Sequence, residues 1–349
     1  MAPGSNFAGE SDRDQKTFKL KYEDLAVYTG NFSESNYLSH FQFGKLYRGK
    51  IVRDDRTLTV MVKMWEILEK YNFERGDNER RLMDEIMLLR HEMHPGMVKL
   101  YGYCNENHNL GAVYEFNPFD SVFNLIPKDG FTWLQRMKVA LGFASLLKFM
   151  HAPKCSFYKL YIVRNLDCAH IVVDEDYNPK LCDFGLITGG IFPDRTIYIG
   201  YIDVDSFYQS SSSDKQDVFT FGVILLNLVS KRVYSADDTI TRKEVDVVDW
   251  ALKKYKKFLK LLDKTSESER KNIIFSVVDQ NIVAESDFEA ADEEKISELV
   301  IDCVRGKPDE RPTMKQVIKS LLKLKSVKKN ANFLEVTKRV RTCANPKSA

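Results

Sequence analysis

The chain has 349 residues, of which 44% are hydrophobic and 29% are charged, and its formal net charge is +2. This balance is typical of a globular protein with one large domain or two lobes, and a charge so close to zero argues against nucleic acid as a partner. The six cysteines are scattered without a C-x-x-C pair, which argues against a zinc site or a disulfide framework.

Residues 1–16 are polar and rich in Gly, Ser and Asp, which is typical of a loose tail without the apolar core of a signal peptide. The most apolar run of the chain, Phe219 to Val229, is too short to cross a bilayer. We therefore expect a cytoplasmic protein with no transmembrane segment, which reaches the plasma membrane at most as a peripheral protein carried by its partners.

Hydrophobic periodicity predicts that a β-rich part comes first. The pattern from Tyr37 to Lys63 predicts strands, with a hairpin turn at Asp54-Asp55. An apolar stripe of Leu82, Ile86 and Leu89 among charged residues predicts an amphipathic helix over 77–91. The other elements expected in this part are a leading helix over 18–31 that ends at Gly30-Asn31, and short strands near 98–103 and 112–116.

After Pro118 the pattern becomes mainly helical, with long periodic stretches at 132–151, 215–230 and 293–304. A β-rich part followed by a larger helical part predicts an α+β fold with two lobes. On this basis the chain divides into a tail with a leading helix (1–30), a β-rich N-lobe (31–116), a helical C-lobe (117–326) and a basic tail (327–349).

Two stretches of the helical part carry the strongest signal. They are Val163-Arg164-Asn165-Leu166-Asp167-Cys168-Ala169-His170 and Asp183-Phe184-Gly185. They resemble the catalytic loop H-R-D-L-x-x-x-N and the metal-binding D-F-G of protein kinases, at kinase spacing. Further kinase motifs are matched in the right order by Val60–Lys63 for the strand lysine, Glu85 for its helix partner, Val113–Phe116 for the hinge, and Asp217–Gly222 and Glu310–Met314 for two C-lobe motifs.

Other short motifs resemble those of the receptor-like kinases of plants, namely Asn31-Phe32-Ser33, Leu100-Tyr101-Gly102-Tyr103-Cys104 and Val248-Asp249-Trp250. Within that group the short length, His170 and Gly200-Tyr201-Ile202-Asp203 resemble the pseudokinases known as HopZ-ETI-deficient related kinases. The resemblance implies a bilobal protein-kinase fold and a catalytically inactive adaptor in plant innate immune signalling. The partners that it implies are a nucleotide-binding leucine-rich-repeat resistance protein and other receptor-like cytoplasmic kinases, with pathogen effectors as a further candidate.

Three catalytic-loop positions depart from the kinase pattern. Asn165 replaces the catalytic Asp, and its amide cannot accept a proton at neutral pH, a loss typically worth about 10²–10⁴ in rate. His170 replaces a metal-binding Asn, and imidazole suits zinc or copper better than magnesium. Asp167 replaces a lysine that faces the transferred phosphate, so its carboxylate would repel that phosphate. These degenerate positions predict a chain that has no catalytic residues and is not an enzyme, although Asn165 and His170 can also be interpreted as stabilising the loop.

Other positions of the kinase pattern are kept. The candidates for nucleotide binding are Lys63, Glu85 and Asp183 around the phosphates, Glu115 and Phe116 at the hinge, and Gly44 in the glycine-rich loop. A competing interpretation makes Lys63, Glu85 and Asp183 an internal salt-bridge network that holds the lobes together. Phe41 occupies the second glycine position of the loop, where it opposes close approach to phosphates. We expect no required cofactor; ATP binding stays open, magnesium binding is weak or absent, and Asp183 is the single candidate metal ligand.

The segment after Asp183 is apolar for a loop, and exposed apolar surface often marks a partner site. The candidates for partner binding are Ile191, Phe192, Ile197 and Ile199, unless these side chains pack into the C-lobe. The stretch Lys253–Lys260 is interpreted as a solvated helical face with an apolar back. Two rival functions stay open, namely a weakly active serine/threonine kinase in which Asn165 orients the substrate hydroxyl, and a switch that binds ATP without turnover.

Overall fold

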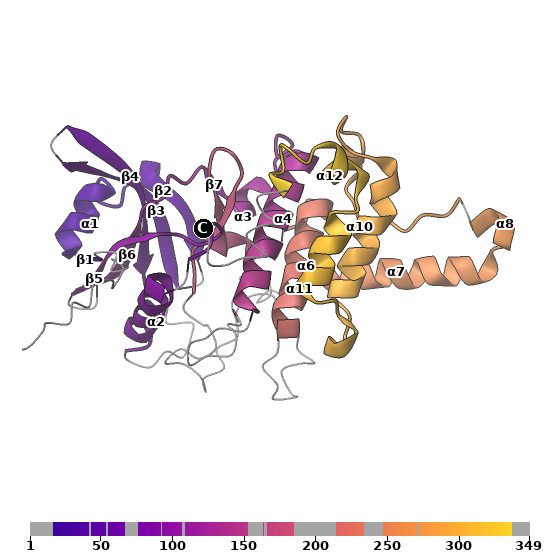
Figure 1. The fold of residues 1–349 in the computed structure, drawn as a ribbon, viewed down its shortest axis with the longest axis horizontal. Coiled ribbons are helices and arrows are strands. Elements are labelled where there is room, and N and C mark those ends of the chain that lie inside the picture. The colour runs from indigo at the N-terminus through magenta and orange to yellow at the C-terminus, as the bar shows by residue number, and fades with distance from the viewer. Residues whose placement is uncertain are drawn as a thin grey trace, which may run out of the picture.

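A computed structural model gives the fold of the chain. It describes residues 17–41, 43–53, 55–66, 76–91, 93–106, 109–152, 163, 166–184, 214–233, 247–270 and 272–336. A β-rich lobe and a larger helical lobe lie side by side (Figure 1), and the expected two-lobed α+β fold is confirmed.

The N-lobe is built on a six-stranded sheet of order β1-β5-β6-β4-β3-β2. Its strands are β1 (Phe18–Lys19), β2 (Tyr37–Phe41), β3 (Gly44–Arg53), β4 (Arg56–Trp65), β5 (Leu100–Glu106) and β6 (Asn109–Tyr114), with a 3₁₀ turn η1 (Glu34–Asn36) before β2. Strands β3 and β4 form the predicted hairpin, in which Arg53 pairs with Arg56 across the turn. Lys63 pairs with Ala112 on β6, so it sits in the middle of the sheet.

The two faces of β4 pack into different cores, because successive side chains of a strand point to opposite faces. Val60 and Val62 pack with Leu25 in a small core of the N-lobe. Met61 and Trp65 belong to the main core, which continues into the helical lobe. Lys63 lies between Met61 and Trp65 in this alternation, so the strand directs it toward the junction of the lobes.

The leading segment does not form one continuous helix. Its first residues form β1, which pairs in parallel with β5, and helix α1 (Tyr22–Tyr28) follows. The side chain of Asp24 accepts a hydrogen bond from the N–H of Lys21 at 2.8 Å and fixes the start of the helix. The chain leaves the helix close to the predicted stop, where Gly30 and Asn31 adopt φ of 59° and 58°.

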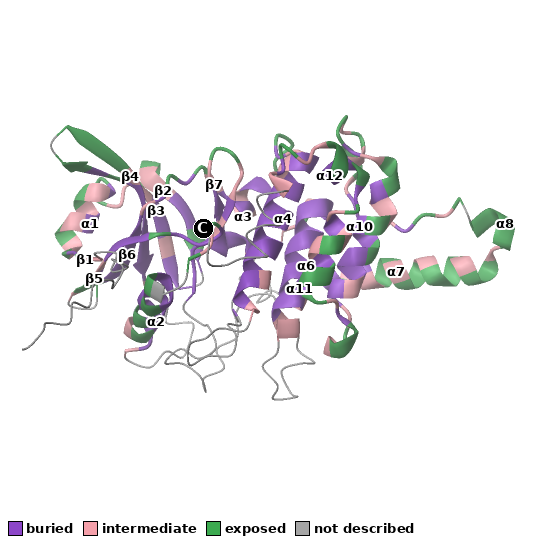
Figure 2. Cartoon of the chain, viewed as in Figure 1, coloured by how far each residue is buried: buried purple, intermediate pink, exposed green. Residues whose placement is uncertain are grey.

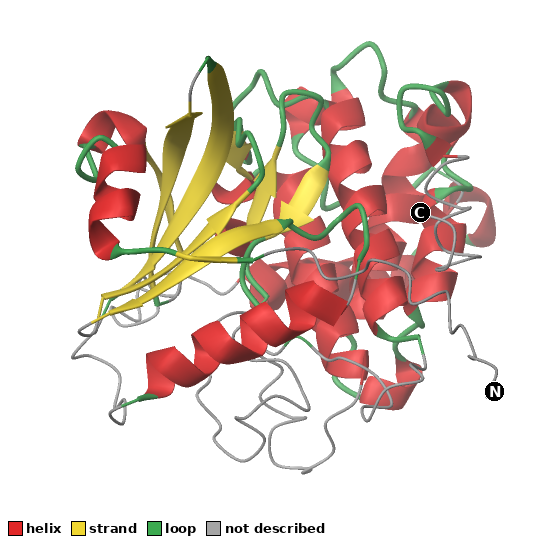
Figure 3. Ribbon diagram, turned by 60° about the vertical axis from the view of Figure 1, so that its left-hand side comes forward, coloured by secondary structure: helices red, strands yellow, loops and turns green. Residues whose placement is uncertain are grey.

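Helix α2 (Asp77–His91) coincides with the predicted amphipathic helix and runs beside the sheet (Figure 3). Its stripe of Leu82, Ile86 and Leu89 is buried in the main core. Residues three and four apart share one face of a helix, so Glu85 lies on this same face. The periodicity that buries this apolar stripe therefore also directs the Glu85 carboxylate toward the core.

In its described residues, the C-lobe is helical apart from a small three-stranded sheet of order β7-β8-β9. The predicted helices over 132–151, 215–230 and 293–304 are confirmed as α4, α6 and α10, and Figure 2 shows α4 and α6 as the most deeply buried of them. The elements are α3 (Val122–Leu125), α4 (Trp133–Met150), α6 (Asp214–Ser230), α7 (Val247–Lys264), α8 (Glu267–Arg270), α9 (Gln280–Val283), α10 (Ala290–Cys303), α11 (Met314–Leu321) and α12 (Lys325–Lys329), with β7 (Asp120–Ser121), β8 (Ile171–Val173), β9 (Pro179–Leu181) and the 3₁₀ turns η2 (Cys168–His170) and η4 (Pro308–Glu310). None of the helices in the described ranges has the length and apolar character that a bilayer crossing requires.

Candidate functional site

Three charged side chains meet in the interior at the junction of the lobes. The Nζ atom of Lys63 lies 2.7 Å from Oε2 of Glu85 and 2.7 Å from Oδ1 of Asp183, and it donates to the carbonyl of Cys182 at 3.1 Å. All three charged side chains are at most 1% exposed. An ammonium has three N–H donors, and here each of them has an acceptor. The salt-bridge network of the competing interpretation is therefore present, while phosphate binding by the same residues stays a prediction.

Tyr114 extends this network by one residue. Its hydroxyl donates a hydrogen bond to Oε1 of Glu85, and the whole side chain is buried at the end of β6. Both oxygens of Glu85 are thus held, one by Tyr114 and the other by Lys63. The hinge motif alone gives no sign of this bond, because Tyr114 and Glu85 are far apart in the sequence.

Burial and charge act against each other on these groups. Burial raises the pKa of Glu85 above its ordinary value, although the ammonium of Lys63 opposes this rise. Burial alone would lower the pKa of Lys63, but the carboxylates of Asp183 and Glu85 outweigh it and hold that pKa above its ordinary value. Lys63 is therefore charged at neutral pH, and two acidic groups share one buried cation.

Aromatic rings fill the space around the Lys63 ammonium. Nζ lies 4.5 Å from the ring centroid of Phe41 and 4.4 Å from that of Trp65, within the range of cation–π attraction. The two rings meet edge to face at 5.7 Å, and Phe41 is 2% exposed. Since Phe41 occupies the second glycine position of the kinase phosphate loop, its ring stands beside the lysine that the motif assigns to phosphates. A nucleotide that reaches Lys63 through this loop has to displace the ring.

The rest of the loop is tightly packed as well. Phe43 is fully buried, and Cζ of Arg81 on α2 lies 3.8 Å from its ring centroid. A Cβ atom added at Gly44 would lie 1.9 Å from the carbonyl oxygen of Met64, so only glycine lets β3 approach β4 this closely. Gly44 therefore has a packing role whether or not it also binds a nucleotide.

The catalytic-loop residues His170 and Asp167 both have contacts within this part of the fold. Nδ1 of His170 lies 3.6 Å from Oδ2 of Asp183, and its ring lies edge to face with Phe41 at 6.4 Å. The carboxylate of Asp167 accepts a hydrogen bond from the N–H of Ala169 at 2.8 Å and begins the turn η2. Asp167 is thus a local cap, and its repulsion of a phosphate stays a prediction.

The start of the catalytic loop is attached to α6 through Asp217. Its Oδ2 accepts a hydrogen bond from the N–H of Val163 at 3.0 Å and lies 2.8 Å from Nε2 of His151. Burial raises the pKa of Asp217, against the opposing effect of His151. These contacts pair the buried carboxylate and give Asp217 a structural role at the start of the catalytic loop.

At the hinge, the side chain of Glu115 turns to the surface and forms an ion pair with Lys99 at 2.5 Å. The backbone N–H of Glu115 donates to the carbonyl of Lys99 at 2.8 Å, and the N–H of Phe116 donates to the carbonyl of Tyr114 at 2.9 Å. Nucleotide binding by Glu115 and Phe116 stays a prediction.

Several predicted positions lie outside the described residues. They are Asn165 in the catalytic loop and the four partner-binding candidates Ile191, Phe192, Ile197 and Ile199. Over the described ranges, no three or more His, Cys, Asp or Glu side chains are grouped to hold a metal ion. Asp183 has Oδ1 near Lys63 and Oδ2 near His170, and its role as a metal ligand stays a prediction.

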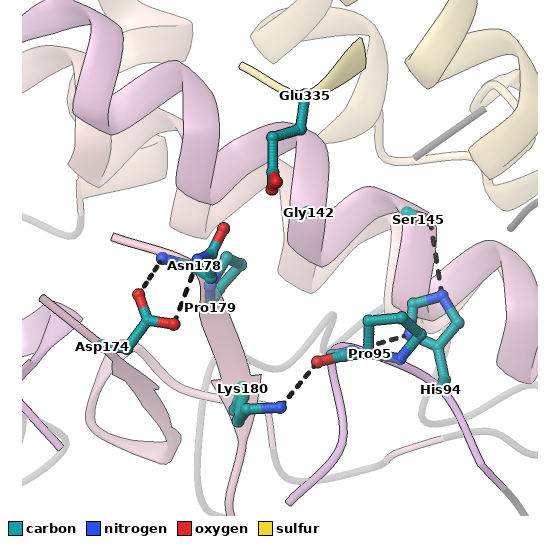
Figure 4. A pocket seen from close by; sticks show the side chains of 10 residues that line it. His94, Pro95, Gly142, Ser145, Asp174, Asn178, Pro179, Lys180 and Glu335 are labelled. Atoms are coloured by element: carbon teal, nitrogen blue, oxygen red, sulfur yellow. Dashed lines mark hydrogen bonds between the residues drawn. The ribbon is translucent and has the colours of Figure 1, made fainter. Parts of the chain in front are cut away.

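A separate cavity of about 220 Å³ opens between α4, the turn before β9 and the segment that follows α12 (Figure 4). Its polar groups bond to one another: the N–H of Gly96 donates to Nδ1 of His94 at 2.9 Å, and Nζ of Lys180 donates to the carbonyl of Pro95 at 2.8 Å. None of its lining residues belongs to the network around Lys63.

A β-rich lobe, a helical lobe and a buried lysine–glutamate–aspartate network at their junction define a protein kinase domain. The family model described as protein tyrosine and serine/threonine kinase matches residues 33–321. The chain therefore belongs to this family.

Similar proteins place the chain more narrowly. The probable serine/threonine-protein kinase PBL16 of Arabidopsis thaliana is 31% identical over 333 residues, which cover 89% of this chain and 74% of the relative. The probable serine/threonine-protein kinase PBL12 of the same plant is 31% identical over 323 residues, covering 90% and 71%. The EPD1-interacting receptor-like cytoplasmic serine/threonine-protein kinase of Nicotiana benthamiana is 29% identical over 310 residues, covering 86% and 62%. These matches support the plant receptor-like cytoplasmic kinase group, and the HopZ-ETI-deficient related subgroup stays a prediction.

The expectation that the chain is not an enzyme is wrong. The kinase family model spans the catalytic region, and the relatives are named serine/threonine-protein kinases. The replacement of three catalytic-loop side chains does not by itself exclude the reaction. Phosphoryl transfer depends mainly on positioning and electrostatics, and the described site keeps the lysine, glutamate and aspartate of the kinase pattern.

Proposed function

We propose that the chain is a serine/threonine protein kinase that slowly transfers the γ-phosphoryl group of ATP to a protein hydroxyl. The observation that carries this proposal is the buried contact of Lys63 with both Glu85 and Asp183. Protein kinases need this ion pair and this aspartate to hold the phosphates and their metal. The names of the similar plant proteins support the same activity.

Each residue has a definite part in this proposal. Lys63 exchanges one of its intramolecular acceptors for a phosphate oxygen, while Glu85 keeps it in place. Asn165 donates or accepts a hydrogen bond to orient the substrate hydroxyl, but it cannot take up the proton. The bond from the γ-phosphorus to the hydroxyl oxygen forms, the bond to the β-phosphate oxygen breaks, ADP leaves, and the hydroxyl proton passes to water.

Slow transfer follows from the lack of a proton acceptor at Asn165. A general base typically contributes about 10²–10⁴ in rate. The transition state of phosphoryl transfer is loose, so positioning and charge stabilisation supply most of the catalysis without that base.

The donor set allows one magnesium ion near Asp183. Magnesium is commonly held by one or two carboxylates together with phosphate oxygens and water, a set that Asp183 and ATP can provide. The imidazole of His170, 3.6 Å from Asp183, is a poor magnesium ligand. A bound magnesium ion neutralises phosphate charge, and we expect its affinity here to be weak.

Replacing Asp183 by asparagine tests the proposal. The change is nearly isosteric and leaves Lys63 paired with Glu85, so the fold is expected to persist. We expect phosphate incorporation from γ-labelled ATP into a basic protein substrate to fall at least about tenfold, because a charge-assisted contact worth about 1.5–3 kcal/mol is lost. The matched control is Asp263→Asn on the exposed part of α7, which should keep native incorporation.

The outcomes separate the rival functions. Equal incorporation by native protein and Asp183→Asn would point to a contaminating kinase and contradict the proposal. ATP binding by calorimetry without any incorporation by the native protein would favour the switch that binds ATP without turnover.

We also propose that the chain binds a nucleotide-binding leucine-rich-repeat resistance protein and other receptor-like cytoplasmic kinases in plant immune signalling. The motif resemblance supports this proposal, and the apolar residues Ile191 and Phe192 are the proposed contacts. Affinity purification from the native tissue should recover such partners with the native chain and lose the partner kinase with Ile191→Glu/Phe192→Glu. Equal recovery by both would exclude this contact surface.

A further inference from the structure

Helix α7 extends from the helical lobe into solvent and ends next to α8 (Figure 1). One side of it is covered by the chain itself, because the rings of Tyr255 and Phe258 pack on Phe275 at 5.0 and 5.5 Å. The opposite side is exposed over the last three turns of the helix, as the green colour of α7 in Figure 2 shows.

The exposed side carries a row of lysines. Lys253, Lys256, Lys257, Lys260 and Lys264 recur at intervals of three and four residues, so they occupy about one third of the helix circumference. All five are exposed. We call this surface the lysine face of α7.

Little within the described part of the chain neutralises the lysine face. Nζ of Lys253 pairs with Asp249 at 2.5 Å, at the end of the helix nearest the lobe. Lys256, Lys257 and Lys260 form no ion pair with any other described residue. A positive surface therefore remains on the projecting part of α7.

Exposed leucines border the lysine face on both sides. Leu259 is 41% exposed and Leu261 is 49% exposed. On a helix with 3.6 residues per turn, Leu259 lies beside Lys256 and Leu261 lies beside Lys257. Apolar side chains at the edges of a row of lysines match the boundary between lipid headgroups and acyl chains.

We propose that the lysine face of α7 docks on an anionic lipid bilayer. A row of four to eight basic residues on an amphipathic helix is attracted to phosphatidylserine and phosphoinositides. Lysine keeps its water strongly and is depleted from the cores of protein interfaces, where arginine and aromatic residues dominate. A headgroup layer accepts hydrated ammonium groups without stripping them, so lipid fits this surface better than an acidic protein does. The proposal does not depend on phosphoryl transfer.

Vesicle sedimentation with the full chain tests this docking. The native chain should bind vesicles of phosphatidylcholine with 30% phosphatidylserine, leave pure phosphatidylcholine vesicles unbound, and dissociate as the salt is raised from about 0.1 to 0.5 M. The variant Lys256→Gln/Lys257→Gln/Lys260→Gln should bind about 100-fold more weakly, because each lysine near the surface strengthens binding about fivefold. Glutamine is a good helix former, so α7 should stay intact, and circular dichroism checks this.

The matched control removes three exposed lysines on α11 and just after it, as Lys315→Gln/Lys319→Gln/Lys323→Gln. It has the same net charge as the α7 variant and should keep near-native vesicle binding. Equal loss of vesicle binding in both variants would show that overall charge causes the effect and would overturn the proposal. Absent vesicle binding would also overturn it, and binding of poly-glutamate in that case would assign the face to an acidic protein.

Discussion

Replacing Phe41 by glycine should raise the affinity of the chain for ATP by about 10- to 100-fold. The ring is 2% exposed and its centroid lies 4.5 Å from Nζ of Lys63, so a nucleotide has to move it into water. Exposing a buried phenylalanine costs about 1.5–3 kcal/mol, and each 1.4 kcal/mol is about a factor of ten in a binding constant. Glycine removes this cost and gives the loop the backbone freedom that phosphate-binding loops use. Isothermal titration with ATP measures the change.

A leucine at the same position distinguishes the effect of the aromatic ring from the effect of backbone freedom. Phe41→Leu keeps an apolar side chain that a nucleotide must still displace, so its gain in affinity should be much smaller than that of Phe41→Gly. Thermal unfolding of both variants checks that the N-lobe is intact. Unchanged or weaker ATP binding by folded Phe41→Gly would show that the ring does not stand in the path of the nucleotide.

Replacing Lys63 by methionine should lower the free energy of unfolding by about 3–5 kcal/mol, because two buried carboxylates lose their shared cation. Burial already raises the pKa of Glu85, and loss of the ammonium should raise it further. A folded-state pKa above the unfolded value means that the folded chain binds more protons. The variant should therefore regain stability as the pH falls through that raised pKa. Urea denaturation at several pH values measures both effects.

Two companion variants make this prediction specific. Lys63→Met/Glu85→Gln removes one of the uncompensated charges and should recover part of the lost stability. Lys99→Met breaks an ion pair of similar length with Glu115, but that pair is 48% and 31% exposed and should cost less than about 1 kcal/mol. Equal losses in the free energy of unfolding from Lys63→Met and Lys99→Met would show that burial does not decide what each ion pair contributes to stability.

Periodicity and motif order were sufficient for much of the fold and for the centre of the site. The hairpin of β3 and β4 and the helix α2 follow from local patterns that need no knowledge of the rest of the chain. The apolar stripe of α2 predicts the inward face of Glu85, whereas Lys63 and Asp183 were expected beside it from the order of the kinase motifs. Alternation along β4 also places Trp65 on the same face as Lys63, which is a sequence signal for the ring beside the ammonium.

Contacts between distant segments could not be predicted in this way. Strand β1 has two residues, too few for any period, and its partner β5 lies far along the chain. The position of Phe41 over Lys63 and the bond from Tyr114 to Glu85 arise only when the sheet and α2 are assembled. The charge of Asp167 predicts repulsion of a phosphate, whereas its local hydrogen bond to Ala169 is a capping interaction that any loop aspartate can make.

The pairing of Phe18 and Lys19 with Gly102 and Tyr103 has a consequence for the whole sheet. It covers two of the seven residues of β5, the strand that would otherwise form this border of the sheet. A bare strand of that length offers unpaired N–H and C=O groups to any neighbouring chain and invites aggregation. We therefore expect a chain trimmed to the matched residues 33–321 to expose more of this edge and to aggregate more readily than the full chain.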